Sequence, residues 1–303
     1  MSIFVTGGSG FLGKHLISKL SATGEKVVAP SSIFCDLRSE GSLHSYTESF
    51  EKIYHLAAWT QAGDFCLRYP GDQWIINQQI NTNVLNWWAK SQPQAKLVFI
   101  GTSCAYPEDE VLVEERYMQG EPTKSLYTYA MTKRMLLQGA RALGDQFGLR
   151  WLCLVPSTLY GPGYHAVGKQ LHFVYDLARK IELGASNGEP VVLWGDGFQR
   201  RELIHVEDFL RDLMELDALV ENQIINIGAG QDHSIREFAE MLSIAIGFDH
   251  RLIEYDTKAY VGARSKLLSN ARLEGLLGKV ERVPIHDGLQ ELAEQAKGLR
   301  GAR

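Results

Sequence analysis

The sequence has few cysteines, and none of them stands in a paired motif. The four, Cys35, Cys66, Cys104 and Cys153, lie far apart among 303 residues and form no CxxC pair. Zinc sites and disulfide-bonded miniproteins need cysteines that are closely spaced or numerous, so the sequence predicts neither, and no metal site is expected. Reduced thiols, as in the cytoplasm, are the default for such isolated residues.

The chain also lacks a strong charge of either sign and a long hydrophobic run. Lys and Arg number 31 against 36 Asp and Glu, which gives a formal net charge of −5. This balance provides no long-range attraction for nucleic acid or anionic lipid, so any phosphate-bearing ligand must be held by local groups. There is no bilayer-spanning stretch and no basic, apolar leader. We therefore expect a cytoplasmic, unprocessed protein that binds neither nucleic acid nor membrane.

What the chain does contain is ample apolar mass and an alternation of strand and helix patterns. Its residues are 45% hydrophobic and 22% charged, and its length suggests two domains, or one large one, at roughly 150 residues per domain. Helical patterns at 74–90 and 129–147 alternate with short apolar runs at 3–6, 26–29, 52–56, 97–100 and 151–155. Parallel strands need crossovers that cover both sheet faces, so this alternation predicts an α/β fold with a doubly wound parallel sheet.

The pattern changes after residue 156. Gly and Pro punctuate 160–163, a helix pattern follows at 169–183, and shorter mixed segments fill the remainder. We predict a first domain at 1–160 and a smaller mixed α/β domain at 161–303. Strand-like segments at 202–206 and 224–227 suggest that the region around 200–228 returns to the first domain or flanks the cleft.

A glycine-rich heptapeptide, residues 7–13, lies where the first predicted strand turns into the first predicted helix. It contains Gly7, Gly10, Phe11, Leu12 and Gly13. The glycines permit a tight turn and a close approach of the main chain to a pyrophosphate, whose charge the helix N-terminus stabilises. At this place in an alternating α/β chain, the motif favours a dinucleotide site of the Rossmann type over a merely structural turn.

The end of the second predicted strand bears on the choice of cofactor. It reads Ala29-Pro30-Ser31-Ser32, without the carboxylate that would bond the ribose 2′-hydroxyl of NAD. The two serines can bond a 2′-phosphate, so NADP is favoured, while NAD stays open because the nearest arginine is Arg38. Asp36 is a candidate for the adenine end, with an exposed loop aspartate as the alternative.

A second constellation joins Thr102, Ser103 and Cys104, just after the strand at 97–100, with Tyr129 and Lys133. Residues at i and i+4 share one helix face, so the lysine ammonium can lie beside the phenol and lower its pKa. Such a phenol exchanges protons with a carbinol or ketone oxygen. The hydroxyl-bearing turn follows a sheet strand, where ligands of open α/β sheets bind, and this favours a catalytic set over a surface pair.

Together these motifs, with residues 55–58 and 201–208, resemble the extended short-chain dehydrogenase/reductase (NAD-dependent epimerase/dehydratase) family over nearly the whole chain. The resemblance implies an enzyme with a Rossmann domain for the dinucleotide and a C-terminal domain for a nucleotide-sugar. It implies catalysis by Thr102, Tyr129 and Lys133. It further implies cofactor contacts at Asp36, Leu37, Leu56, Ala57, Ala58, Pro156, Thr158 and Leu159, besides the glycine turn, Tyr129 and Lys133.

Within that family the chain is similar to the GDP-L-fucose synthases, which epimerise and reduce GDP-4-keto-6-deoxymannose. The similar stretches are 101–107, 119–123, 156–162, 194–197 and 266–273. The similarity implies that Cys104 and His172 exchange protons beside a C4 ketone before hydride transfer to C4. It also implies substrate contacts at Ser103, Lys180, Trp194 and Arg201, with Lys180 and Arg201 on the diphosphate.

The acid–base pair is chemically reasonable, because inverting a carbon beside a ketone needs a base on one face and an acid on the other. A thiolate and an imidazolium can fill these roles near neutral pH. Segments 59–63 and 164–168 depart from the synthase pattern, and Ser9 replaces a typical arginine, so the exact sugar and the number of inverted carbons stay open. Alternatives are a redox-neutral NAD-dependent 4-epimerase, a C4 reductase and a dinucleotide sensor.

A homodimer is also predicted. The helix patterns at 74–90 and 129–147 are apolar on more than one face, which leaves a surface to be covered after each helix has packed on its own sheet. The resemblance implies that these helices pair between two copies of the chain.

Overall fold

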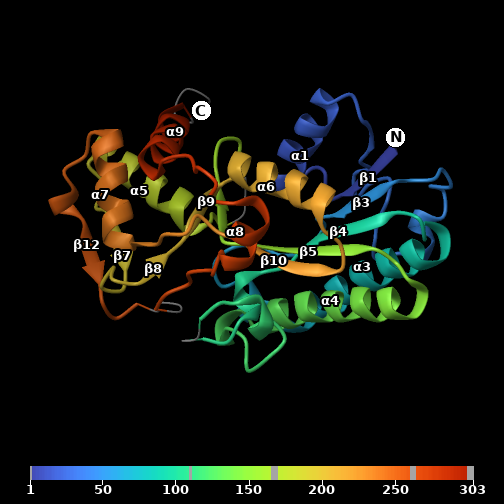
Figure 1. The fold of residues 1–303 in the computed structure, drawn as a ribbon. Helices are drawn as coiled ribbons and strands as arrows, with labels where there is room; N and C mark the ends of the chain where they lie inside the picture. Colours follow the sequence, from blue (N-terminus) through green and yellow to red (C-terminus); the bar gives the residue numbers. More distant parts are fainter. Residues whose placement is uncertain (1, 109–110, 165–169, 260–263, 299–303) are drawn as a thin grey trace.

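A six-stranded parallel sheet forms the centre of the molecule (Figure 1). The computed structural model describes residues 2–108, 111–164, 170–259 and 264–298. The strands run in the order β10-β5-β4-β3-β1-β2, and every adjacent pair is parallel. Their bounds are β1 Ser2–Thr6, β2 Lys26–Val28, β3 Lys52–His55, β4 Lys96–Ile100, β5 Trp151–Pro156 and β10 Gln223–Ile227. The predicted doubly wound α/β fold is confirmed.

Helices cover both faces of this sheet, as Figure 1 shows. α1 (Phe11–Ala22) and α6 (Val206–Leu219) lie on one face, and α3 (Pro70–Ser91) and α4 (Tyr127–Phe147) lie on the other. Successive residues of a strand point to opposite faces, so Leu97 and Phe99 join the core under α3 and α4 while Val98 joins the core under α1 and α6. Burial on both faces explains why the strands read as continuous apolar runs.

The C-terminal half has a hydrophobic core of its own. α5 (Phe173–Asn187), α7 (Ile235–Ile246) and α9 (Ile285–Gly298) surround it, with Phe238, Leu242 and Leu289 at less than 2% exposure. The helix expected at 169–183 is α5, which begins at Phe173 and ends at Asn187. Residues 165–169, and with them most of segment 164–168, lie outside the described residues. Two shorter helices are α2 (Phe65–Arg68) and α8 (Ala271–Leu277).

Three two-stranded sheets lie outside the main sheet. β7 (Val192–Trp194) pairs with β12 (Glu254–Asp256), β8 (Arg200–Arg201) with β11 (His233–Ser234), and β6 (Thr158–Tyr160) with β9 (Leu203–His205). Residues 223–227 are β10 and lie beside β5 in the main sheet. The boundary at residue 160 stays a prediction.

The carboxyl ends of the parallel strands meet at one edge of the sheet. The turn after β1, the segment after β3 and the 3-10 turn η2 (Ser103–Ala105) after β4 all lie there. In open α/β sheets this edge is where ligands bind. In the described ranges, no helix is both long enough and apolar enough to cross a membrane.

Candidate active site

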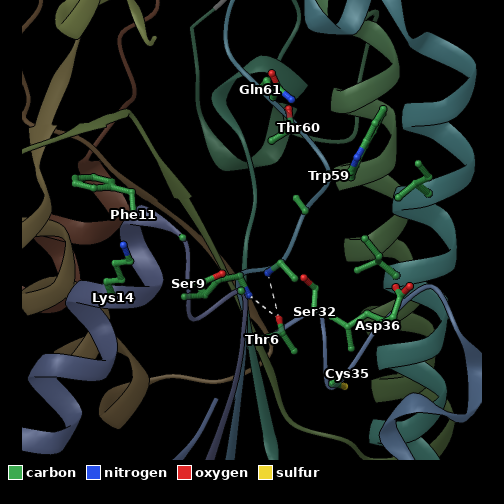
Figure 2. A pocket seen from close by; sticks show the side chains of 18 of the residues that line it. Thr6, Ser9, Phe11, Lys14, Ser32, Cys35, Asp36, Trp59, Thr60 and Gln61 are labelled. Atoms are coloured by element: carbon green, nitrogen blue, oxygen red, sulfur yellow. Dashed lines mark hydrogen bonds between the residues drawn. The ribbon is translucent and has the colours of Figure 1, made fainter. Parts of the chain in front are cut away.

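A cavity of about 750 Å³ opens at the carboxyl ends of β1 and β3. Figure 2 shows Phe11 and Lys14 of α1 on one side, Ser32 and Asp36 on the opposite side, and Trp59 above. Ligand sites commonly measure roughly 300–1,000 Å³, so the space suits a dinucleotide. Among the described residues, no group of three or more His, Cys, Asp or Glu side chains is placed to hold a metal ion.

The glycine turn forms the floor of this cavity. Gly7 has a φ of +71°, and a Cβ atom there would stand 2.7 Å from the amide nitrogen of Ala57. A Cβ on Gly13 would overlap the carbonyl oxygen of Gly7. Both positions therefore require glycine, which lets the start of α1 approach the main chain after β3. The resulting cradle of main-chain groups at a helix N-terminus fits a pyrophosphate.

Replacing Gly13 by alanine is expected to weaken dinucleotide binding by at least about tenfold and to lower the melting temperature, because the turn must open to admit the methyl group. Titration of cofactor fluorescence and thermal denaturation measure the two effects. Gly41→Ala is the control, since a Cβ there meets no atom within 4 Å. Unchanged dinucleotide binding in Gly13→Ala would show that the glycine turn is not part of the binding site.

Thr6 fixes the main chain after β3, which forms one wall of the cavity. Its hydroxyl oxygen accepts from the amides of Leu56 and Ala57, each at 3.1 Å, as the dashed lines in Figure 2 mark. Its own proton then goes to Nδ1 of His55 at 2.8 Å, which leaves Nε2 to donate to Asn81 at 3.1 Å. Burial, with a contribution from Lys133, lowers the pKa of His55 to about 4, so this histidine is neutral and structural.

The side of the cavity opposite α1 (Figure 2) carries an ion pair that the sequence pattern did not reveal. Arg38 binds Asp36 through Nε at 2.9 Å and Nη2 at 2.6 Å, and these bonds lower the pKa of Asp36. Both side chains and Ser32 line the cavity. Residues 30–32 contain no arginine, but Arg38, eight residues beyond Pro30, lines the same cavity as Ser32.

Eight of the predicted cofactor residues line this cavity together: Gly7, Gly10, Phe11, Asp36, Leu37, Leu56, Ala57 and Ala58. Of the described residues predicted with them, Leu12, Gly13, Tyr129, Lys133, Pro156, Thr158 and Leu159 do not line it. Leu12 packs against the core, Gly13 is buried beneath the turn, and Thr158 and Leu159 lie in β6. Residues that the motifs missed include Lys14, Arg38, Trp59 and Gln61.

The predicted effect of Lys133 on Tyr129 is not seen. Lys133 Nζ lies 5.8 Å from the centre of the Tyr129 ring and donates to the carbonyl of Ile100 at 2.8 Å. Burial raises the pKa of Tyr129, with further contributions from Cys104 and Cys66, and burial lowers the pKa of Lys133 to about 8. Helix spacing places the two groups on one face, but loss of water outweighs their attraction in this structure.

Cys104 and His172 both lie near one lysine. Cys104 is partly buried in η2, and Lys266 Nζ stands 3.3 Å from its sulfur. His172 is the N-cap of α5; part of the residue is exposed, yet surrounding protein lowers the pKa of its imidazole, and the charge of Lys266 adds to this effect. His172, at the N-cap of α5, and Cys104, in the turn after β4, thus lie near the same lysine although they come from different halves of the chain.

Next to Cys104 lies a second cavity, of about 560 Å³. Ser103, Phe198, Arg200, Arg264 and Lys266 are among its lining residues. The cationic wall suits an anionic ligand. None of the arginines or lysines in that wall was predicted as a substrate contact.

The other predicted substrate residues are more dispersed. Lys180 binds Asp176 at 3.2 Å, Arg201 donates to the carbonyl of Arg200 at 2.6 Å, and Trp194 is 63% exposed. Among these described residues, Lys180, Trp194, Arg201 and His172 line neither cavity. Their roles stay predictions.

Comparisons with known proteins agree with this geometry. The model of the NAD dependent epimerase/dehydratase family matches residues 3–228. GDP-L-fucose synthase 1 of Arabidopsis thaliana is 31% identical, over 95% of this chain and 91% of that protein, and the Escherichia coli GDP-L-fucose synthase is 28% identical, over 95% and 94%. A GDP-L-fucose synthetase from Naegleria fowleri, crystallised with NADP, superposes with a TM-score of 0.85 at 23% identity, covering 99% of this chain and 95% of that one.

Proposed function

This chain belongs to the NAD dependent epimerase/dehydratase family, and from that premise we propose that it is an NADP-dependent epimerase/reductase of a GDP-linked 4-keto-6-deoxysugar. The observation that carries the proposal is that the helix face of Tyr129 and Lys133 lies at the carboxyl end of β4, where Lys133 Nζ donates to the carbonyl of Ile100 at 2.8 Å, four residues before Cys104. A thiol suits proton exchange beside a ketone, and a phenol suits protonation of the ketone oxygen. A redox-neutral 4-epimerase would leave Cys104 without a chemical role.

The cofactor is held by main-chain and side-chain groups of the 750 Å³ cavity. The glycine turn and the start of α1 would hold the pyrophosphate, and Asp36 and Leu37 would bind at the adenine end. Ser32 and Arg38 would hold a 2′-phosphate, which favours NADP over NAD. When bound, the dihydronicotinamide supplies a hydride for C4 of the sugar.

Side chains of the protein carry out the proton transfers. Cys104 removes a proton from a carbon beside the C4 ketone, and His172 returns one on the opposite face, which inverts that carbon. Thr102, 9% exposed, accepts from the amide of Cys104 at 3.3 Å and so orients the turn that carries the thiol. Tyr129 then gives its proton to the C4 oxygen as reduction occurs.

Incubation with GDP-4-keto-6-deoxymannose in deuterated water tests both halves. Without NADPH, deuterium should enter the carbons beside the ketone; with NADPH, absorbance at the cofactor band should fall in step with formation of a 4-hydroxy product. Deuterium exchange without NADPH oxidation would show that the protein is an epimerase that does not reduce the sugar. Oxidation without exchange would leave a C4 reductase, and neither reaction would refute the proposal.

Arg38→Ala tests the cofactor assignment. We expect KM for NADPH to rise by about tenfold or more, and KM for NADH to change by less than about threefold, because only NADPH presents a phosphate to the guanidinium. Arg251→Ala is a matched control, since Arg251 makes the same paired bonds to Asp249 but lies outside the cavity. An equal rise for both cofactors would contradict the assignment.

We also propose a homodimer that pairs α3 and α4 of two copies. These helices expose Trp74, Ile75, Tyr127 and Met135, each 38% to 55% accessible. Light scattering should give twice the chain mass of 33.9 kDa. The monomer mass would rule the dimer out.

A further inference from the structure

We propose that Lys266 is a positioning residue of the proton exchange: its ammonium holds Cys104 as a thiolate and so assigns the first proton abstraction to that sulfur. This inference rests on the proposed function, and it goes beyond it, because motif and resemblance gave Lys266 no role. The contact joins residues that are 162 positions apart in the chain.

The geometry of the contact is that of a charge-assisted hydrogen bond. Lys266 Nζ lies 3.3 Å from Cys104 Sγ, and both residues are partly buried. A thiolate beside an ammonium is stabilised, and the effect is larger where protein has displaced water. The same lysine lines the second cavity with Ser103, the residue before Cys104, so the contact between lysine and thiol lies beside that cavity.

The other titratable groups around Cys104 do not supply this charge. Burial raises the pKa of Tyr129 in α4 and of Cys66 in α2, and Cys104 adds to the effect on both, so each is neutral near pH 7. Arg134 of α4 is the cation packed behind η2, and its guanidinium donates to the carbonyls of Ala105, Gln119 and Gly120. Among the residues that the structure describes, Lys266 is therefore the cation that contacts the thiol.

The lysine is held in place by its neighbours in the chain. The amide of Leu268 donates to Glu202 Oε2 at 3.0 Å, and the amide of Ser269 donates to the carbonyl of Leu112 at 3.0 Å. Glu202 is 1% exposed and also accepts from the amide of Gly230 at 2.8 Å. This anchoring begins two residues after Lys266 and fixes the main chain close to the point from which its side chain extends.

The same charge acts on the second member of the pair. Burial lowers the pKa of the His172 imidazole, and the charge of Lys266 adds to this effect. A single cation thus favours the negative form of Cys104 and disfavours the positive form of His172. Removing the Lys266 ammonium should therefore shift both the acidic and the alkaline limb of the pH profile of deuterium exchange toward higher pH.

Alkylation of the substrate-free protein by iodoacetamide tests the inference without depending on the substrate. At pH 7 the Lys266→Met variant should alkylate Cys104 about tenfold more slowly than the wild type, with the rate recovered near pH 9. Lys266→Arg should retain the wild-type rate, and Lys258→Met is the control for removal of an exposed lysine. Cys35, Cys66 and Cys153 are buried and serve as internal references in peptide mapping.

The outcomes separate this inference from the proposed function. An unchanged alkylation profile in Lys266→Met, with deuterium exchange present, would overturn the role of Lys266 and leave the function intact. A shifted profile with no exchange on any GDP-4-keto sugar would support the charge relation and refute the function. Should Lys266→Met fail to fold, Lys266→Gln keeps a hydrogen-bond donor without the charge and gives the same readout.

Discussion

Tyr129→Phe is expected to slow NADPH oxidation on the 4-keto sugar by about 10²- to 10⁴-fold while deuterium exchange beside the ketone continues. The substitution removes one hydroxyl from α4 and keeps the ring that Lys133 faces at 5.8 Å. Proton exchange is assigned to Cys104 and His172, so it does not need the phenol. Spectrophotometry in the cofactor band and mass spectrometry of the recovered sugar measure the two rates.

Two variants bracket this result. Tyr127→Phe removes a hydroxyl from a tyrosine that is 41% exposed on the same helix, and it should change neither rate. Cys104→Ser should show the reverse pattern, with exchange lost and reduction of an already epimerised substrate kept. Loss of exchange together with reduction in Tyr129→Phe would mean that the phenol also takes part in enolisation.

Lys133→Met is expected to abolish most of the reduction while making the cofactor-free protein more stable. Lys133 is 5% exposed, and burial lowers its pKa from 10.5 to about 8. Keeping it charged at pH 7 therefore costs the fold about 3 kcal/mol. Methionine of similar length avoids this cost and loses a hydrogen bond to Ile100, worth about 1 kcal/mol, so a net gain of about 2 kcal/mol is expected.

The pH dependence of unfolding checks the cause. Between pH 8 and 10.5 the unfolded chain binds the lysine proton and the folded chain does not, so wild-type stability should rise with pH through this window. The variant should lack that rise, and its advantage should vanish above pH 10.5. Lys90→Met, on the exposed side of α3, should alter neither stability nor rate. A destabilised Lys133→Met with a wild-type pH profile would contradict the argument.

Local patterns determined the fold class and eight of the residues that line the 750 Å³ cavity. The apolar strands predicted a sheet buried on both faces, and Phe4, Leu97 and Val98 do lie in its two cores. The glycine turn was predictable because both the backbone conformation of Gly7 and the small size of Gly13 are encoded within seven residues. Tyr129 and Lys133 share a helix face for the same reason: helical spacing is a local property.

Tertiary structure alone decided the electrostatics. The ammonium of Lys266 contacts Cys104 across 162 positions of the chain, and the main chain after Lys266 is bound to Glu202 and Leu112; no spacing rule predicts such contacts between distant segments. Burial, which depends on the whole fold, raised the pKa of Tyr129 where spacing predicted that it would fall. The sequence by itself thus determined which chemical groups gather at the edge of the sheet. The packing decided their protonation, because water exclusion and long-range contacts exist only in the folded chain.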